Sequence, residues 1–424
     1  MLLCDYMPKS IHLFLFLFVT CSFLVCLYYS EIEENVSRRL GPHLLGSNLR
    51  NLQSSEEISA VTGAKTIPKV TPSASVQHGE DEYQNKTAQL VYNYSANSLN
   101  DRSSAEIIHL AVILCNVGQK AALKWNFKKM TRSLIHHCSK NIALHFHLVT
   151  DPTSWETAKE IIHHEAKISK LNVQVGIPNL YLFYIPVYSK LTFFFNLQVS
   201  AYFIDTFAKQ FVTTIKVLQQ YFSARPGTYY GQALFYVSVR LPDLIPSDVK
   251  TLIFLDVDTE FRDNIENLNQ HFQYFDNKQL LGLAPELSPV YRHILYVYRN
   301  QHKTSLLGEP KGKGFPGYNS GVVLMKLDRM RQSVIYQSLI TNSSLSNLTK
   351  KYSFKGHLGD QDFYSLAAFE NPELFYTLPC NWNRQLCQWW KSKGYDDIFD
   401  LFYECKGFIS LFHGNCNSQI PDAT

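Results

Sequence analysis

The sequence predicts an α/β protein, because short continuous apolar runs alternate with segments of helical spacing. Residues 107 to 115, IIHLAVILC, and 142 to 149, IALHFHLV, are suited to buried strands. The turn at residues 116 to 118 leads into a helical segment through Met130, and a second helical segment covers about 155 to 162. This β-α-β-α start favours a Rossmann-like sheet.

The second half of the chain continues the alternation. Residues 207 to 222 have helical spacing, and a further helix is expected between 227 and 245. Three apolar runs, 251 to 255, 280 to 286 and 321 to 327, supply more strands. The hydrophobic content of 46% is ample for a large core, and no internal repeat of fixed period is visible.

Two aspartates follow the strand at residues 251 to 255. Asp256 and Asp258 stand one residue apart at its carboxyl end, where open α/β sheets bind their ligands. Residues i and i+2 of an extended chain point to the same side, so both carboxylates can reach one hard cation. For an isolated pair of this kind we would prefer the alternative of a solvated turn, so the rest of the chain decides between the two.

The first hundred residues differ in composition from the rest. Residues 11 to 29 contain no formally charged side chain and can just cross a bilayer as a helix, which favours an uncleaved anchor after a tail at residues 1 to 10. A signal peptide is the alternative, but no A-x-A-like cleavage site follows. Residues 30 to 104 are polar, so we expect a flexible stem ahead of a folded domain at residues 105 to 424. The basic residues beside the anchor do not settle its orientation.

Glycosylation acceptors and cysteines indicate an oxidising compartment. The acceptors that follow the anchor are Asn35, Asn85, Asn93, Asn342 and Asn347. Cysteines cluster near the carboxyl terminus without a C-x2-C pair, which favours disulfides over a zinc site and leaves their pairing open. They are Cys380, Cys387, Cys405 and Cys416. Cys115 and Cys138 are expected to be buried thiols.

Two further segments have packing interpretations. Residues 180 to 204 are hydrophobic, but Pro186, Lys190 and other polar residues interrupt them. We therefore reject a second membrane span and expect a buried or partly ordered insertion. His145 and His147 alternate on one strand and are expected to be packing residues rather than ligands. The formal charge of +4 is spread without a basic block, which gives no reason to invoke nucleic acid.

Three later motifs are rich in groups that sugars and nucleotides need. Gly317-Tyr318-Asn319-Ser320-Gly321 precedes an expected strand, and its small residues permit close approach of a ligand. Residues 356 to 362, GHLGDQD, combine loop glycines with amide and carboxylate groups that can hydrogen-bond to sugar hydroxyls. His413-Gly414-Asn415 places an imidazole beside a glycine. Their occurrence together with the aspartate pair favours a ligand site over ordinary loops.

In this order and spacing the motifs resemble glycosyltransferase family 8, a retaining group with the GT-A fold. The segments 289 to 293, 380 to 390 and 413 to 417 strengthen the resemblance, which runs from about residue 106 to the end. The stem and residues 180 to 204 lie outside it. The resemblance implies one GT-A Rossmann-like catalytic domain, preceded by a transmembrane helix and a stem.

The resemblance also implies roles for particular residues. Asp256, Asp258 and His413 would bind Mn2+, with Mg2+ as the alternative ion, and the metal would hold the diphosphate of the donor. The donor-binding residues would be Cys115, Asn116, Val117, Val257, Ser320, Leu358 and Gln361. Trp390 and Asn415 would face the acceptor, and Gln361 is the candidate catalytic group. Unlike many members of the family, this chain has no lysine after His413 and Gly414 to grip the diphosphate.

Within the family the chain is most similar to xylosyltransferases. This similarity implies transfer of xylose from UDP-α-D-xylose, in α-1,3 linkage, to the xylose of Xyl-α-1,3-Glc-β-O-Ser on EGF-like repeats of Notch-type glycoproteins. It also implies a single-pass type II protein of the endoplasmic reticulum membrane with a luminal catalytic domain, the Golgi being the alternative. Two other functions stay open: a related luminal transferase, such as a glucoside xylosyltransferase, and a catalytically inactive glycan-binding protein.

Overall fold

The computed structural model describes residues 107–139, 142–176, 197–223 and 232–422. The expected tail, anchor and stem lie outside the described residues, as do Asn35, Asn85 and Asn93 and most of the expected insertion. Among the helices that the structure does describe, none has the length and apolar character needed to cross a membrane.

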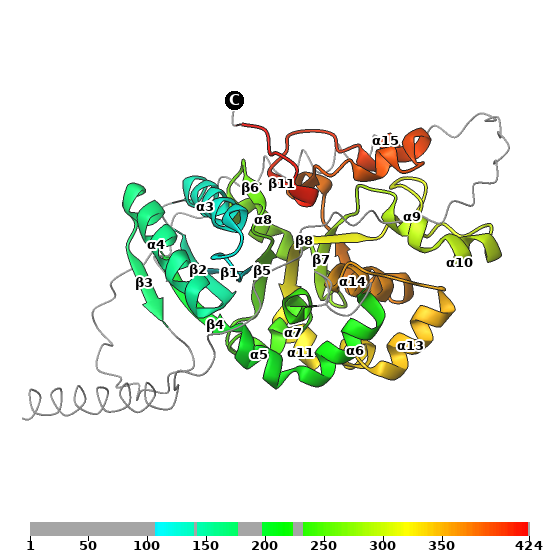
Figure 1. The fold of residues 1–424 in the computed structure, drawn as a ribbon, viewed down its shortest axis with the longest axis horizontal. Coiled ribbons are helices and arrows are strands. Elements are labelled where there is room, and N and C mark those ends of the chain that lie inside the picture. Colours follow the sequence, from blue (N-terminus) through cyan, green and yellow to red (C-terminus); the bar gives the residue numbers. More distant parts are fainter. Residues whose placement is uncertain (1–106, 140–141, 177–196, 224–231, 423–424) are drawn as a thin grey trace, which may run out of the picture. The chain divides into compact units, whose positions relative to one another are not determined.

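A mixed sheet of eight strands forms the centre of the fold, in the order β3-β4-β2-β1-β5-β8-β7-β9 (Figure 1). Its strands are β1 (Ile107–Leu114), β2 (Ala143–Thr150), β3 (Val173–Gly176), β4 (Leu197–Phe203), β5 (Thr251–Leu255), β7 (Leu281–Pro285), β8 (Tyr318–Lys326) and β9 (Phe375–Thr377). Only β8 pairs antiparallel with its neighbours, β5 and β7, whereas the other pairings in this sheet are parallel. The α/β prediction is confirmed, with one reversed strand that the apolar pattern could not reveal.

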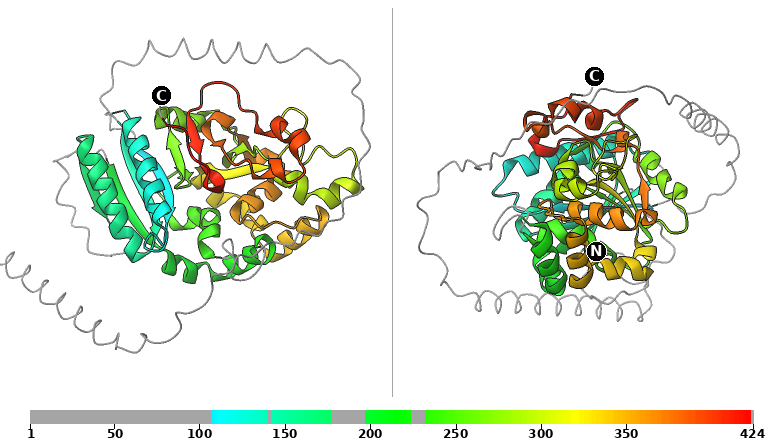
Figure 2. Two further views of the ribbon diagram at one scale, coloured as in Figure 1. Left: turned by 45° about the horizontal axis from the view of Figure 1, so that its top comes forward. Right: turned by 90° about the vertical axis from the view of Figure 1, so that its right-hand side faces the viewer.

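Helices cover both faces of this sheet. One face carries α3 (Ala121–His136), α4 (Pro152–Ile168) and α8 (Ile265–Gln270). The other face carries α5 (Ile204–Gln210), α6 (Val212–Phe222), α7 (Val237–Leu244), α9 (Val290–Ile294), α11 (Leu327–Gln332), α12 (Val334–Leu339), α13 (Asn342–Lys351) and α14 (Asp360–Glu370). The remaining helices described are α10 (Tyr296–Gln301) and α15 (Asp396–Tyr403). Figure 2 shows α3 and α4 lying side by side.

The two-sided cover explains why the strands read as continuous apolar runs. Along β5, Leu252 and Phe254 pack into the core on the α7 side, while Ile253 and Leu255 pack into the core on the α3 side. Successive side chains of a strand point to opposite faces, so a strand covered on both faces needs apolar residues at every position. The run can end only where the strand leaves the sheet, which is where Asp256 stands.

A second sheet of three short strands lies beside the end of β5 (Figure 2). It consists of β10 (Arg384–Gln385), β11 (Leu411–His413) and β6 (Thr259–Phe261). β11 pairs antiparallel with β6, so that His413 is the register partner of Thr259. These strands are too short to leave a periodic signal in the sequence, and we did not predict them.

The end of the expected insertion belongs to the central sheet. Leu197–Phe203 form β4, between β2 and β3, so the interpretation of residues 180 to 204 as an insertion was wrong for these seven residues. Val199 and Tyr202 are buried in the two cores. The polar residues that interrupt the segment here, Gln198 and Ser200, alternate with apolar ones, which is the pattern of a strand with one less buried face.

Two other expectations need adjustment at their boundaries. The helical segment at 207 to 222 is two helices, α5 and α6, which meet at Phe211 with φ of −110°. The motif at 317 to 321 does not precede a strand, because β8 already begins at Tyr318. Ser320 is therefore held by the ladder of the central sheet rather than by a loop.

The cysteine predictions can be compared directly with the structure. The prediction of disulfides is confirmed, and the pairs are Cys380–Cys405 and Cys387–Cys416. Cys115 is a buried thiol as expected, whereas Cys138 is only half-buried. Asn342 and Asn347 are both exposed on α13, so each acceptor side chain is accessible to modification.

Candidate active site

Two aspartates and a histidine from distant parts of the chain converge at the carboxyl end of β5. The Nε2 atom of His413 lies 3.5 Å from a carboxylate oxygen of Asp256 and 3.5 Å from one of Asp258. Because β6 follows the aspartates directly and pairs with β11, its ladder carries His413 to this position. The N–H of Gly414 extends the contact by donating to the carbonyl of Asp258 at 2.7 Å.

The histidine ring is oriented by an amide behind it. The Nδ1 atom of His413 lies 3.0 Å from the side-chain oxygen of Asn383. The amide nitrogen of Asn383 donates to Asn319, so its oxygen is the end that faces the ring and accepts the proton of Nδ1. The lone pair of Nε2 then points at the two carboxylates, which is the arrangement in which a histidine ligates a metal ion.

The electrostatics of the three groups fit a bound cation. Enclosure in the protein and the neighbouring Asp258 carboxylate raise the pKa of Asp256 to about 7. Burial also raises the pKa of Asp258, but His413 outweighs it and the net shift is downward. Burial lowers the pKa of His413, yet the two aspartates raise it more. A divalent ion bound by this donor set would favour the ionised form of both carboxylates, so these residues suit a metal site.

Gly321 gives the imidazole the space that it occupies. A Cβ atom at this position would lie 2.2 Å from Cε1 and 2.4 Å from Nδ1 of His413, far inside van der Waals contact. The backbone of the same residue also accepts a hydrogen bond of 2.9 Å from the N–H of Asp256. The glycine of the predicted 317 to 321 motif therefore allows β8, the first aspartate and the histidine ring to pack against one another.

An open cavity of about 910 Å³ begins at these three residues. It is lined by all but one of the residues predicted for the site: Cys115, Asn116, Asp256, Val257, Asp258, Ser320, Leu358, Gln361, Trp390, His413 and Asn415. Val117 is the exception, because its side chain is buried in the core on the α3 side and its N–H donates to the hydroxyl of Ser154. The volume is sufficient for a nucleotide sugar.

The loop after β1 is fixed to the loop after β2. The backbone N–H of Asn116 donates to a carboxylate oxygen of Asp151 at 2.6 Å, and the same carboxylate caps α4 through the N–H of Ser154. These bonds lower the pKa of Asp151 against the opposing effect of burial. Asn116 has a φ of 63°, which an asparagine tolerates better than most residues. One side of the cavity is thus a turn that the Asp151 carboxylate holds in place.

A buried polar network lines the opposite side of the cavity. The amide nitrogen of Asn319 lies 3.0 Å from Glu286 and 3.0 Å from the side-chain oxygen of Gln361. The amide nitrogen of Gln361 donates to the same Glu286 oxygen at 3.2 Å. Asn319 is also the partner of Asn383, so the network reaches His413 without interruption. The position of Gln361 is therefore coupled to the orientation of the histidine.

Glu286 is a site residue that the sequence did not identify. It is buried, it lines the cavity, and burial raises its pKa in spite of hydrogen bonds from Ser288, Asn319 and Gln361. In the sequence it is only the last residue of the apolar run at 280 to 286. A charged residue at the carboxyl end of a predicted strand is the signal that could have found it, as it found Asp256.

The carboxylates of the 356 to 362 motif are already engaged by protein groups. Asp360 accepts from the hydroxyls of Ser238 and Ser320, and Asp362 accepts from the hydroxyl of Tyr291 and the N–H of Leu358. Burial raises the pKa of Asp360 to about 6 and that of Asp362 to about 7. These two acids hold the loop and the start of α14, and Gln361 between them faces the cavity.

Aromatic residues form the outer wall of the cavity. Trp390 lies edge-on to Trp389, with ring centroids 4.9 Å apart, and both line the cavity. Tyr395 contacts Trp390 at 5.5 Å and His293 contacts it at 5.0 Å. His293 comes from the 289 to 293 segment, so that segment supports the wall. Trp389, with 53% of its surface exposed, is a second residue that sequence reasoning missed.

The disulfide Cys387–Cys416 braces Asn415 beside the aromatic wall. The side-chain oxygen of Asn415 accepts from the N–H groups of Leu386 and Cys387, both at 2.9 Å. Its amide nitrogen is thereby directed away from these backbone groups and can serve a ligand in the cavity. The bridge joins the same two segments covalently.

Lys120 supplies the positive charge of the cavity wall. Among the described lining residues it is the one lysine, and no arginine accompanies it there. The sequence left open which basic residue replaces the missing lysine after Gly414. Lys120 lies four residues beyond Asn116, at the start of α3, so it stands beside the loop after β1.

A profile of glycosyl transferase family 8 matches residues 129–399. The match covers more than half of the chain and includes the aspartate pair, Gln361 and Trp390. The chain therefore belongs to glycosyltransferase family 8. The mixed sheet with covered faces described above fits the GT-A fold of that family.

Within the family, the chain is a homologue of xyloside xylosyltransferase 1. It is 34% identical over 316 residues to the human protein, covering 74% of this chain and 75% of the human one. It is 40% identical over 228 residues to the mouse protein, but the match spans only 58% of that protein, less than two thirds of its length. The crystal structure of mouse xyloside xylosyltransferase 1 in its apo form has a TM-score of 0.65 and 33% identity, covering 74% of this chain and 100% of the mouse one.

Replacing Gly321 with alanine should disturb the histidine. The new Cβ would lie 2.2 Å from Cε1 of His413, so the ring must move away from the carboxylates. With Mn2+ as the probe ion, EPR titration of the full chain should then show an affinity at least about tenfold lower, or ~1.4 kcal/mol. Gly118→Ala is the matched control, because its Cβ would meet nothing nearer than Thr153 at 3.8 Å. Equal Mn2+ affinity in a folded Gly321→Ala protein would exclude His413 as a ligand.

Proposed function

We propose that this chain is a retaining, Mn2+-dependent xylosyltransferase that uses UDP-α-D-xylose. Its acceptor would be the xylose of Xyl-α-1,3-Glc-β-O-Ser on EGF-like repeats of Notch-type glycoproteins, and the new bond an α-1,3 linkage. The observation that carries the proposal is the convergence of Asp256, Asp258 and His413 at one end of a cavity large enough for a nucleotide sugar. The similarity to xyloside xylosyltransferase 1 supports the choice of xylose.

The proposed metal ligands are the two carboxylates and the Nε2 atom of His413. Oxygen donors with one imidazole suit Mn2+, and Mg2+ is the alternative ion. When bound, the ion would offset the negative charge of the UDP diphosphate as it departs. Asn383 keeps the Nδ1 proton in place and so keeps the lone pair of Nε2 available to a ligand.

The residues on the two sides of the cavity have distinct proposed roles toward the donor. Cys115, Asn116 and Val257 contact the nucleotide from the ends of β1 and β5, and Lys120 approaches the phosphates. Ser320, Leu358 and Gln361 face the xylose. Because Glu286 and Asn319 both hold the amide of Gln361, that amide presents a fixed dipole to the sugar.

We favour a substitution on one face of the sugar. The bond from the anomeric carbon to the phosphate oxygen breaks, the bond to the acceptor hydroxyl oxygen forms, and the hydroxyl proton passes to the departing phosphate. Gln361 is an amide and cannot form an ordinary glycosyl ester, while Asp360 and Asp362 are each held by two protein donors.

Mass analysis of rapidly quenched enzyme should accordingly find no xylosyl ester on these residues or on Glu286.

The proposed address is the endoplasmic reticulum membrane, in a single-pass type II orientation with the catalytic domain in the lumen. Two observations favour an oxidising lumen: the bridges Cys380–Cys405 and Cys387–Cys416, and the exposed acceptors Asn342 and Asn347. The Golgi lumen shares these properties and is the alternative compartment.

Asp258→Asn should remove transfer while the fold stays intact. The change deletes one carboxylate charge from the proposed metal ligands without changing the size of the side chain. We expect Mn2+-dependent transfer of xylose to a xylosyl-glucosyl EGF-repeat peptide to fall by at least about 100-fold. Asp397→Asn, an exposed carboxylate on α15, is the control and should keep full activity.

The same assay separates the alternative functions. Parallel reactions use UDP-xylose, UDP-glucose and UDP-galactose as donors, and glucosyl and xylosyl-glucosyl peptides as acceptors. Xylose transfer to the glucosyl peptide alone would identify a glucoside xylosyltransferase. Peptide binding without turnover of any donor would identify a glycan-binding protein, and either result overturns the proposed reaction.

Trp390→Ala should weaken acceptor binding. A sugar stacked on the indole ring would lose an aromatic contact of about 1 kcal/mol, so we expect the acceptor KM to rise roughly five- to tenfold while the donor KM changes little. Trp125→Ala is the control, since that side chain is 61% exposed on α3. An increase in the donor KM alone would assign Trp390 to the donor instead.

Glycosidase treatment tests the proposed topology. Protein made in mammalian cells should lose mass from Asn342 or Asn347 on digestion, because a luminal catalytic domain meets the glycosylation machinery. The Asn342→Gln and Asn347→Gln double variant should migrate like digested protein. Unmodified acceptors together with cleavage by a cytosolic protease would reverse the orientation.

A further inference from the structure

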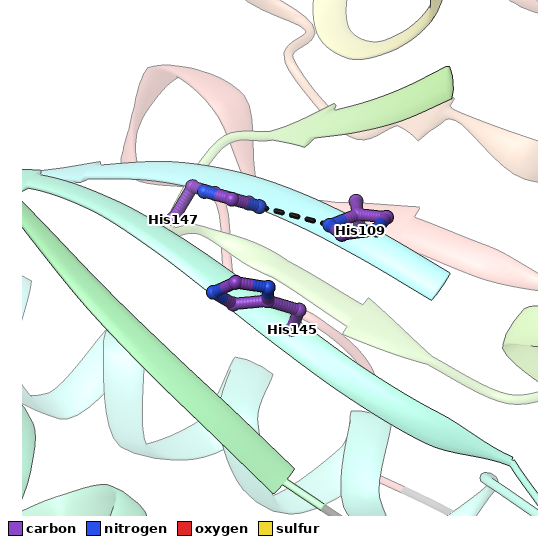
Figure 3. A group of neighbouring side chains, drawn as sticks. All are labelled: His109, His145 and His147. Atoms are coloured by element: carbon purple, nitrogen blue, oxygen red, sulfur yellow. Dashed lines mark hydrogen bonds between the residues drawn. The ribbon is translucent and has the colours of Figure 1, made fainter. Parts of the chain in front are cut away.

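Three histidines gather on one face of the central sheet, away from the cavity. His109 of β1 and His145 of β2 are direct register partners, and His147 stands two residues further along β2 (Figure 3). Their face is the one covered by α5, α6 and α7, where neighbouring positions such as Ala111 and Val149 are apolar. His147 is completely buried and the other two are half-buried. The rings of His145 and His147 stack with centroids 4.1 Å apart, which is the packing role predicted from the sequence. Their ring nitrogens leave room for a second role.

The ring nitrogens are close enough to share one ion. One nitrogen from each histidine lies within 4.8 Å of the others. The Nδ1 atom of His109 and the Nε2 atom of His147 are only 3.0 Å apart, and Figure 3 shows them pointing at one another. Two nitrogens that each bind a metal at ~2.1 Å in tetrahedral geometry lie roughly 3.4 Å apart. This pair is therefore already near ligand spacing. The His145 ring is stacked on the His147 ring, with centroids 4.1 Å apart and planes 27° apart, so its nitrogen joins the pair only when the His145 side chain turns out of the stack.

Two hydroxyls from β4 orient the rings. The hydroxyl of Tyr202 lies 2.9 Å from Nδ1 of His147, and that of Ser200 lies 2.9 Å from Nε2 of His145. If each hydroxyl accepts a ring proton, the opposite nitrogen of each ring is left with its lone pair. Metal-binding histidines usually have such a partner on the nitrogen that does not bind. The partners come from the strand whose residues the sequence had assigned to an insertion.

The remaining nitrogens lack protein partners. Nδ1 of His145 and Nε2 of His109 make no hydrogen bond to any residue that the structure describes. The hydrogen bond between Nδ1 of His109 and Nε2 of His147 uses one ring proton, and a metal ion bound between the two nitrogens would take the place of that proton. Neither Nδ1 of His145 nor Nε2 of His109 is among the fully buried side-chain atoms that lack a partner, so both are open to solvent or to a ligand.

The local charge suits a cation bound by neutral ligands. Burial lowers the pKa of all three imidazoles, to about 4 for His145, so they are neutral at pH 7. The carboxylate of Asp248 is the negative charge that acts on His109 and His145, and it is too distant to belong to the ligand group. Three imidazoles without a carboxylate select Zn2+, Cu2+, Ni2+ or Co2+ over Mn2+ and Mg2+.

We infer that His109, His145 and His147 form a binding site for a transition-metal ion of the zinc class. The site is separate from the cavity, because none of its residues lines the cavity. On β1, His109 stands four positions before Ile113, which does line the cavity, and this is roughly 13 Å of strand. The ion would join β1 to β2 and, through Ser200 and Tyr202, fix both to β4. Its role is structural, since it clamps the strands whose carboxyl ends carry the nucleotide loop.

Zinc binding by the full-length chain tests the inference. The Asp256→Asn and Asp258→Asn double variant removes both carboxylates of the other candidate site and serves as the background. After treatment with a chelator, it is dialysed against ZnCl2 alone, and bound zinc is counted by mass spectrometry. We expect one equivalent of zinc in the background, and an affinity at least about 100-fold lower when His109→Gln is added. His163→Gln, an exposed histidine on α4, is the matched control and should change nothing.

Further measurements guard against a folding defect. His109 is half-buried, so His109→Gln avoids the fully buried position of His147, and circular dichroism checks its fold. Tyr202→Phe keeps the ring but removes the hydroxyl from His147, and should weaken zinc binding about 10- to 100-fold. Zinc should raise the melting temperature of the background but not of the background with His109→Gln. Co2+ should show the visible bands of four-coordinate cobalt in the background alone.

Two results would overturn the inference. One is a background protein that binds no zinc. The other is a folded His109→Gln protein that binds zinc as tightly as the background, which would place the ion elsewhere. Neither result bears on the proposed transferase, because the donor and acceptor assays concern different residues.

Discussion

The pairing of two very short strands holds the site together. β6 begins directly after Asp258, and its antiparallel ladder with β11 sets His413 opposite Thr259. That register alone brings the imidazole within 3.5 Å of both carboxylates. Each strand has only three residues, so the ladder cannot be stable by itself. The two disulfides, the backbone bond from Gly414 to Asp258 and the space left by Gly321 hold it in register.

The polar network behind the histidine joins the aspartate and histidine end of the cavity to the Gln361 end. From His413 it passes through Asn383 and Asn319 to Gln361 and Glu286, and every link is a side-chain hydrogen bond of 3.2 Å or less. An amide has a distinct donor end and acceptor end, so fixing one bond fixes the direction of the next. Turning one amide would leave buried donors facing donors, which is costly in a low-dielectric interior. The proton position on His413 and the direction of the Gln361 dipole are therefore set together.

The parts of this structure that could be predicted are those that leave a pattern in a short stretch of sequence. β1, β2, β5 and β7 appear as apolar runs because both faces of each are covered, and Asp256 was recognised because it ends such a run. β10 and β11 could not be predicted, since two or three residues leave no periodic pattern and their partners are remote in sequence. β4 was misread because Gln198 and Ser200 face a partly polar layer, which looked like an interruption. Glu286 and Trp389 were missed because their roles depend on residues that are remote in sequence and contact them only in the folded chain. The roles assigned to the matched motifs depended on the resemblance to the family.

The two histidine-containing clusters differ in a way that bears on metal selectivity. A site with two carboxylates and one imidazole would bind Zn2+ more tightly than Mn2+, because affinity rises along the divalent series toward copper and zinc. Donor type alone therefore cannot reserve the cavity for Mn2+. A group of three neutral imidazoles prefers the zinc class more strongly, whereas carboxylate oxygens also accept harder ions. The two clusters lie on the same sheet but differ in donor type, so they would select different ions from the same pool of metals.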